Sequence, residues 1–220
     1  MPPEQPADAV IAMTGARAED ATVVVATRTE ERAVRRAAPQ FRVHRAGVSL
    51  RQWNNAIATP VVISAGLAGG LDPGNPTGTV VVASHVALAD GESVACDPVW
   101  IDALVSAART LSLPVITGGI VTAKSLVTGA ARDRWARSGY VAADMESGLL
   151  IGRASRVAAL RVLLDTPDRE LSPRWEHPLR ASLDPRRWLE AVWLFRTAPA
   201  LALRAARVLA AAVADATPQK

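Results

Sequence analysis

Two carboxylates directly follow a short apolar run in the segment 140–147, Tyr-Val-Ala-Ala-Asp-Met-Glu-Ser. Asp144 can cap the helix that we expect over 148–154, because its side-chain oxygen can accept a backbone N–H there. Glu146 has no such structural duty, and a carboxylate at that place can bind the hydroxyls of a sugar. The alternative is that both acids only complement the helix dipole. On this segment alone that alternative is slightly favoured.

A third carboxylate, Asp165, ends an apolar run over 157–164. Half-buried at the end of a strand, such a carboxyl group can have a raised pKa, stay protonated near neutrality and act as a general acid. The alternative is that Asp165 begins the turn Asp-Thr-Pro-Asp over 165–168. The turn is the better interpretation of this segment when it is taken alone.

Glu30 and Glu31 follow the first apolar run, over 22–26. One of them could activate a water molecule, and the neighbouring Arg28 could bind phosphate. The alternative is the solvated first turn of a helix, and it is the stronger interpretation for at least one of the two glutamates.

A glycine-rich segment follows the continuous apolar run over 60–64, and we interpret it as a turn made by Gly66, Leu67, Ala68, Gly69 and Gly70. Glycines allow the backbone to approach a ligand closely and to present its N–H groups. The segment lacks both the Gly-Lys-Ser/Thr of a P-loop and the spacing of a dinucleotide-binding turn. A ligand site and a tight strand exit without a ligand remain about equally supported.

These residues need a scaffold that brings them together. We expect a domain over 21–183 that is α/β, with three αβα layers and a central, mostly parallel mixed sheet. The carboxyl ends of its parallel strands would meet at one crevice. The expected strands are 22–26, 41–43, 60–64, 78–84, 113–117, 140–144 and 157–164, and the expected helices are 30–38, 98–111, 123–137 and 148–154.

The two ends of the chain differ from this pattern. Residues 1–20 have early prolines and acids and no signal-peptide pattern, so we expect a flexible tail and a cytoplasmic protein. Residues 184–216 are helical in pattern, interrupted at Pro199, with an apolar face and arginines outside it. Packing on the same domain or on a second subunit is favoured, and peripheral contact with the inner face of a membrane is the alternative.

Composition excludes several classes of protein. The chain has 220 residues and a net charge of +4, and its arginines are scattered among acids, which counts against nucleic-acid binding. A single cysteine, Cys96, and three widely separated histidines predict neither a disulfide framework nor a metal site. No apolar run in the sequence reaches the length of a membrane span.

Three segments together resemble the nucleoside phosphorylase and nucleosidase superfamily, which includes the methylthioadenosine/adenosylhomocysteine nucleosidases. They are Ser-Ala-Gly-Leu-Ala-Gly-Gly-Leu-Asp-Pro at 64–73, Ala-Asp-Met-Glu-Ser at 143–147 and Arg-Val-Leu-Leu-Asp at 161–165. The first two look most similar to the hopanoid-associated phosphorylase branch, which is associated with removing adenine from adenosylhopane. The resemblance covers roughly residues 22–168.

The resemblance implies roles for individual residues. Glu146 would bind the ribose hydroxyls, Met145 would pack against the sugar, and Asp165 would protonate the departing purine at N7. Glu30 or Glu31 would orient the attacking water. The remaining substrate-binding residues would be Gly66, Leu67, Ala68, Gly69 and Leu126. Leu67 stands where the nucleosidases carry a serine, and Leu126 stands where they stack an aromatic ring on adenine.

The expected activity is therefore cleavage of the N-glycosidic bond of a purine nucleoside, with adenosylhopane as the favoured substrate. The alternatives are hydrolysis of methylthioadenosine or adenosylhomocysteine, and an inactive nucleoside-binding protein. We expect no cofactor, and phosphate stays open as a co-substrate. The partner is an adenosyl compound, with a lipid tail as one option. The resemblance also implies a homo-oligomer, in which His44 or Arg45 of a neighbouring copy could complete the site.

Overall fold

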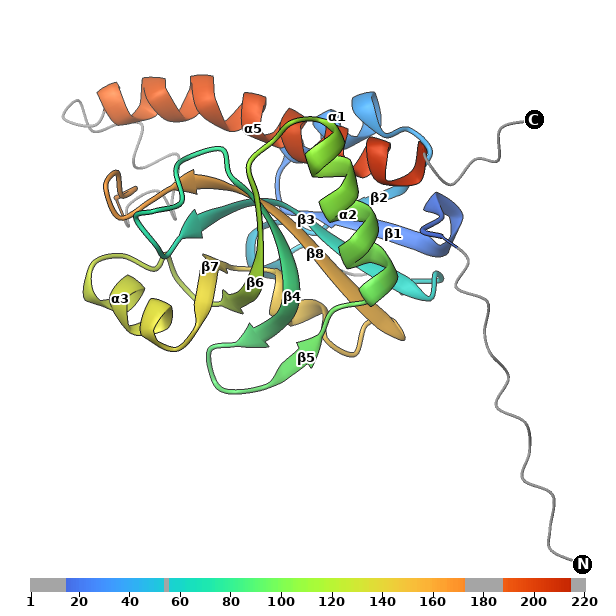
Figure 1. The fold of residues 1–220 in the computed structure, drawn as a ribbon, viewed down its shortest axis with the longest axis horizontal. Coiled ribbons are helices and arrows are strands. Elements are labelled where there is room, and N and C mark those ends of the chain that lie inside the picture. The colour runs from blue at the N-terminus through green and yellow to red at the C-terminus, as the bar shows by residue number, and fades with distance from the viewer. Residues whose placement is uncertain (1–14, 54–55, 173–187, 215–220) are drawn as a thin grey trace, which may run out of the picture.

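The computed structural model describes residues 15–53, 56–172 and 188–214 and has the expected α/β architecture with a mixed sheet (Figure 1). The strands are β1 Ala21–Val25, β2 Arg42–Arg45, β3 Val61–Gly70, β4 Val80–Leu88, β5 Ser93–Ala95, β6 Val115–Thr122, β7 Tyr140–Asp144 and β8 Arg156–Asp165. The helices are α1 Arg28–Ala37, α2 Pro98–Thr110, α3 Ala130–Arg137 and α5 Trp188–Ala214, with 3-10 turns η1 Ala18–Asp20, η2 Val48–Leu50 and η3 Ser147–Leu150.

The sheet closes on itself at its centre. Its strands follow the order β2-β1-β3-β7-β6-β4-β5, and β8 pairs with both β3 and β4. The five strands β3, β8, β4, β6 and β7 therefore form a ring; β1 pairs in parallel with β3, and β2 pairs in parallel with β1. The alternation of strands and helices predicted the α/β class, but no local pattern indicated that the ring closes.

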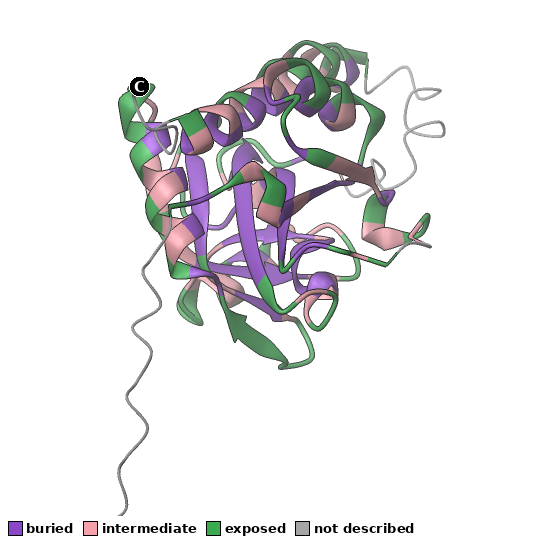
Figure 2. Ribbon diagram, turned by 90° about the vertical axis from the view of Figure 1, so that its right-hand side faces the viewer, coloured by how far each residue is buried: buried purple, intermediate pink, exposed green. Residues whose placement is uncertain are grey.

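Alternate residues of the central strands face two different apolar clusters, because successive side chains of a strand point to opposite faces. Val61, Ile63, Leu160 and Val162 pack against α1, α2 and α5. Val62, Ala159 and Leu163 lie on the other face with Ile120 and Leu150. Figure 2 shows that the central strands are buried along most of their length, as expected for strands covered on both faces.

The glycine-rich segment is not a turn, which corrects the sequence interpretation. Residues 66–70 continue β3, and the strand pairs in parallel with β8 from Val61 to Gly69. Glycine is needed there because of close neighbours: a Cβ on Gly66 would lie 2.3 Å from Glu30 Oε1, and a Cβ on Gly70 would lie 2.9 Å from Leu163 Cδ1. Tertiary contacts thus explain glycines that look locally like turn residues.

Two predicted helices are also wrong in part. The helix expected over 123–137 begins only at Ala130, because Gly129 before it has φ +51°, and residues 123–129 form a loop. The segment expected to be helical over 148–154 is a 3-10 turn, Ser147–Leu150, followed by Gly152 at φ +75°. The N-cap residue of this turn is Glu146 and not Asp144, although the carboxylate of Asp144 accepts the N–H of Ser147 at 3.2 Å.

Helix α5 runs continuously through Pro199, where the sequence predicted an interruption. The second half of the helix buries Leu201, Ala205 and Leu209 against the sheet and against α1 and α2. By length and composition alone this helix could cross a membrane, which corrects the expectation that no apolar segment is long enough. Residues 1–14 of the expected tail lie outside the described part of the chain, as do 184–187 and 215–216 of the expected C-terminal segment. Ala16, which also belongs to the expected flexible tail, is described and is buried.

Candidate functional site

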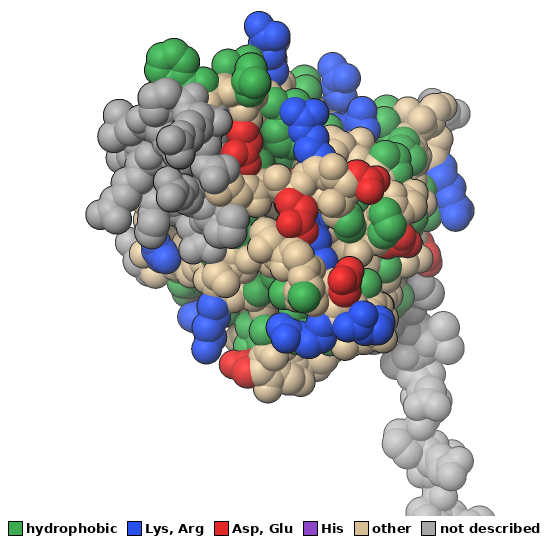
Figure 3. Space-filling model, turned by 90° about the vertical axis from the view of Figure 1, so that its left-hand side faces the viewer, with side chains coloured by type: hydrophobic (Ala, Val, Ile, Leu, Met, Phe, Trp, Pro, Cys, Tyr) green, Lys and Arg blue, Asp and Glu red, His purple; other side chains and the backbone are tan. Residues whose placement is uncertain are grey.

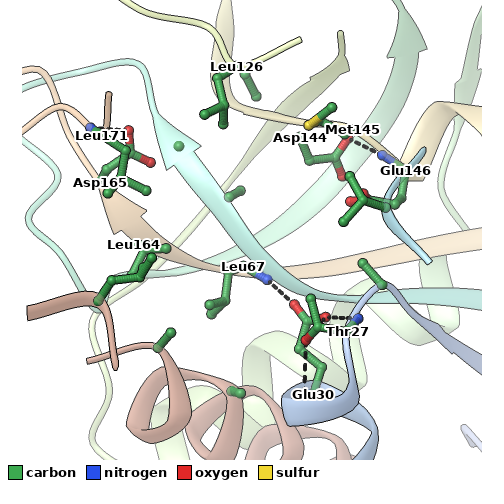
Figure 4. A pocket seen from close by; sticks show the side chains of 18 of the residues that line it. Thr27, Glu30, Leu67, Leu126, Asp144, Met145, Glu146, Leu164, Asp165 and Leu171 are labelled. Atoms are coloured by element: carbon green, nitrogen blue, oxygen red, sulfur yellow. Dashed lines mark hydrogen bonds between the residues drawn. The ribbon is translucent and has the colours of Figure 1, made fainter. Parts of the chain in front are cut away.

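A cavity of about 370 Å³ opens where β3 changes partners. β1 pairs with β3 as far as Ser64, and β7 joins the same edge only at Gly69. The edge of β3 between these points is free for other contacts. A change of strand neighbours of this kind is where α/β sheets commonly bind ligands. Figure 4 shows Asp165 and Leu171 on one side of the cavity, Glu30, Met145 and Glu146 on the other, and Leu67 between them.

A buried arginine organises the acidic side of the cavity. Arg161, on β8, is 1% exposed, and its Nε donates to Asp144 Oδ2 at 2.8 Å. Its Nη2 donates to Ser64 Oγ at 2.7 Å and lies 3.6 Å from Glu146 Oε2. Asp144 thus serves as the partner of Arg161 and as the acceptor of the Ser147 N–H, and does not need to take part in chemistry.

Glu146 is buried in this acidic cluster and lines the cavity. The pKa of its carboxyl group is raised to about 7, mainly by burial; Arg161 opposes this shift, and the nearby carboxylates of Asp144 and Glu30 add to it. The N–H of Ser49 donates to Glu146 Oε1 at 3.1 Å. Ser49 itself has φ +54°, a strained conformation for a residue with a side chain. The loop around η2 therefore holds this carboxylate at a cost in backbone energy.

Glu30 lines the cavity and Glu31 does not. Glu30 Oε2 accepts the N–H and the hydroxyl of Thr27, both at 2.8 Å, as the third helical residue of a capping box. Its Oε1 accepts the N–H of Leu67 at 3.1 Å, on the free edge of β3. Glu31 instead bonds Arg35 and Arg45, each at 3.1 Å, which corrects its candidacy as a site residue and matches the alternative of a surface helix turn.

Asp165 is the last residue of β8 and is buried, and burial raises its pKa. Arg132 of α3 opposes that effect by donating to Asp165 Oδ2 and, through its other Nη, to the carbonyl of Gly70. Glu170 Oε1 lies 3.0 Å from Arg132 Nε. The Oδ1 atom of Asp165 lies beside Gly69, which lines the cavity.

Apolar side chains form the rest of the cavity wall. Leu67, Leu126 and Met145 line it as predicted from the resemblance, and Ala68 and Gly69 lie among them. Leu126 comes from the loop 123–129, which takes the place of the first part of the predicted helix 123–137. Helix α5, which the sequence did not link to the site, adds Leu194, Phe195, Ala198, Pro199 and Ala202.

Two further predicted residues are not part of the cavity wall. Arg28 is exposed at the start of α1, so its proposed contact with phosphate has no support from the geometry. Gly66 lies behind the wall, where its missing side chain makes room for Glu30 and Arg161: a Cβ would also lie 2.7 Å from Arg161 Nη1. Its role is to permit this close approach.

Sequence reasoning missed Arg161 and Arg132 as site residues. Both are 2% exposed or less, although arginine is rarely buried. The signal for Arg161 was its place inside the apolar run 157–164, where a lone charge needs a buried partner. Arg132 lies among other charged residues of α3 and gave no such signal. Among the residues that the structure describes, no cluster of three or more acids, histidines or cysteines is placed to hold a metal ion.

Comparison with known proteins decides the family. The profile of the phosphorylase superfamily matches residues 8–177 of the chain. The chain belongs to this superfamily. Among curated proteins the sequence has no match. As a member of the superfamily it is an enzyme, of a kind that cleaves the glycosidic bonds of nucleosides.

Solved structures of the superfamily share the fold at low identity. The methylthioadenosine/adenosylhomocysteine nucleosidase of Neisseria meningitidis, in complex with methylthio-immucillin-A, has a TM-score of 0.67 and 18% identity, over 90% of this chain and 99% of that chain. The corresponding nucleosidase of Helicobacter pylori has a TM-score of 0.69 and 12% identity, with the same coverage. Futalosine hydrolase of Helicobacter pylori has a TM-score of 0.67 and 12% identity, over 90% of this chain and 98% of that chain. At these identities the likeness establishes the fold.

Proposed function

We propose that this enzyme hydrolyses the N-glycosidic bond of an adenine nucleoside whose ribose carries an apolar 5′ substituent. One observation carries the proposal: Glu30 and Glu146 lie on one side of the cavity and Asp165 on the other (Figure 4), although they come from α1, the end of β7 and the end of β8. A nucleoside spanning the cavity would place its ribose beside the glutamates and its base beside Asp165.

The two sides suit the two charges that develop as the bond breaks. The oxygen of water bonds to C1′ while the C1′–N9 electron pair moves to the purine, so the ribose becomes oxocarbenium-like, as in glycoside hydrolysis. Glu30 accepts a proton from the water, and Asp165 donates one to N7 of the purine. The carboxylate of Glu146 accepts the ribose hydroxyls. A positioned general acid of this kind typically contributes about 10²–10⁴-fold in rate.

Water fits the nucleophile's place better than phosphate does. Of the described residues that line the cavity, only Arg132 carries a positive charge, and it binds Asp165 and Gly70. The ribose side carries the carboxylates of Glu30 and Glu146, which would repel a phosphate ion.

The apolar wall supports adenosylhopane, the substrate of the branch that the sequence resembles, over methylthioadenosine and adenosylhomocysteine. Leu194, Phe195, Ala198 and Pro199 offer a hydrocarbon tail a surface along the cavity. A polar tail such as that of adenosylhomocysteine would find few bonding partners on this wall.

Purified enzyme incubated with each of the three nucleosides, with and without phosphate, tests the proposal through the adenine released. We expect adenine from adenosylhopane without phosphate, and none from the Asp165→Asn variant, which should still bind the nucleoside. If adenine appears only with phosphate, the reaction is phosphorolysis and not hydrolysis. Faster turnover of methylthioadenosine or adenosylhomocysteine would contradict the apolar substituent, and no adenine from any of them would overturn the function.

A further inference from the structure

The first half of α5 carries an exposed apolar ridge, made of Trp188, Leu189, Val192 and Phe195. These residues are 62%, 88%, 48% and 70% exposed, respectively. They are four of the seven large hydrophobic residues that are exposed in the described part of the chain. Their spacing places them on one side of a helix. The second half of α5 is buried instead, so the domain core accounts for only half of this apolar helix.

Among the residues that the structure describes, the exposed charged residues of α5 and of its neighbour α1 are arginines. Arg196 and Arg207 are the exposed charged residues among those described in α5. Glu190 is the acid of the helix, and it accepts the N–H of Ser172 at 2.7 Å, so its charge is directed to the protein. Helix α1 packs against α5 and exposes Arg28, Arg32 and Arg36. Figure 3 shows hydrophobic and basic side chains along the upper edge, with acidic side chains below them.

The ridge is continuous with the cavity. Phe195 is mostly exposed and also lines the cavity, next to Leu194 and Ala198. A ligand held between Glu146 and Asp165 could therefore extend along Phe195 to the outside without leaving apolar surface. Phe195 therefore connects the cavity, where the reaction is proposed, with the exposed apolar ridge on α5.

We propose that the face formed by α1 and the first half of α5 docks on the surface of an anionic lipid bilayer. Trp188, Leu189, Val192 and Phe195 enter the interfacial layer, and the flanking arginines contact lipid headgroups, as in amphipathic helices that lie on membranes. A second copy of the chain fits this face less well, because a two-fold contact pairs the face with itself and so brings the basic residues of both copies to one interface. The proposal concerns binding and does not depend on the proposed reaction.

Sedimentation of the full-length protein with vesicles tests the proposal. The vesicles are phosphatidylcholine alone, or an equimolar mixture of phosphatidylcholine and phosphatidylglycerol. We expect the protein to sediment with the anionic vesicles and to dissociate at high salt. The double variant Leu189→Asp/Val192→Asp should bind the vesicles at least tenfold more weakly, because it puts two carboxylates on the apolar ridge. Neither residue lines the cavity, so the site itself is unchanged. Leu111→Asp, at the exposed end of α2, is the matched control and should bind like the wild type.

Two readouts separate membrane docking from misfolding of the variant and from a contact between copies of the chain. Thermal unfolding checks that the double variant is folded, and its turnover of a soluble adenine nucleoside should equal that of the wild type. Light scattering without vesicles gives the oligomeric state. If the wild-type protein sediments with neither kind of vesicle, the proposal is wrong. A double variant that dissociates into smaller species while losing no vesicle binding assigns the ridge to a contact between copies and also overturns it.

Discussion

Glu146 lies in a cluster where carboxylates outnumber cations. Glu30, Asp144 and Glu146 surround one arginine, Arg161, and burial is the main cause that raises the pKa of Glu146 to about 7. The folded protein therefore holds a proton there between about pH 4.5 and pH 7 that the unfolded chain has already lost. The free energy of unfolding consequently falls as the pH rises through this window.

The Glu146→Gln variant should remove that pH dependence. We expect it to be more stable than the wild type by about 1–3 kcal/mol at about pH 8, and the gain to shrink toward about pH 5. Turnover should fall, because the amide cannot accept both ribose hydroxyls. Urea unfolding across the pH range measures the first effect. Glu31→Gln, at the surface, is the control, and parallel stability profiles for wild type and Glu146→Gln would contradict the prediction.

Burial raises the pKa of Asp165, and the neighbouring guanidinium of Arg132 acts to lower it. Since Arg132 opposes the effect of burial on Asp165, its removal should raise the pKa of Asp165 further. Glu170 is the other charged group described at this place. If Asp165 must be protonated to act, the basic limb of the kcat/KM profile should move to higher pH in Arg132→Leu.

We expect this shift together with at least a tenfold loss in kcat, because the carboxyl group also loses its orientation. Breaking a buried ion pair typically costs about 3–5 kcal/mol, so unfolding is measured in parallel. Arg132→Lys keeps the charge and should leave the limb near its wild-type position. Profiles that coincide for all three proteins would show that Arg132 has no influence on the acid.

At the scale of the element, β3 decides where the site forms. The strand exchanges β1 for β7 along one edge, and Gly66 allows Glu30 and Arg161 to approach its backbone. Gly66→Ala should displace Glu30, lower turnover at least tenfold and destabilise the fold by about 1–3 kcal/mol, as overpacking does. Gly74→Ala, where a Cβ meets only the flexible side chain of the exposed Asp72, is the matched control. Equal activity of the two variants would refute this role.

The same element shows what the sequence could and could not predict. Asp165, Glu146 and Leu126 were predictable, because the ends of apolar strands converge in a parallel sheet and the resemblance supplied roles for them. The glycines of β3 suggested a turn, since their tertiary neighbours Glu30 and Leu163 are distant in sequence. The loop at 123–129 was hidden by helix-forming residues before Gly129. Buried arginines and the contribution of α5 depend on packing, which periodicity does not encode.

At the scale of the whole molecule, the ring of five strands should form the most stable unit. β8 has β3 on one side and β4 on the other, so its amides are paired within the ring. We expect amide hydrogen exchange in β8 and β3 to require global unfolding, while β5 and the loop 123–129 exchange through local opening. Exchange in β8 as fast as in β5, measured by NMR or mass spectrometry, would contradict this expectation.

The capping box at the start of α1 has an evolutionary consequence. Glu30 belongs both to the proposed chemistry and to the first turn of a helix, where it satisfies the N–H of Thr27. Losing a helix cap typically costs about 1 kcal/mol. Selection for a folded protein alone would therefore retain this glutamate. A descendant that has lost its activity should therefore keep Glu30, so the presence of this residue alone does not mark an active enzyme.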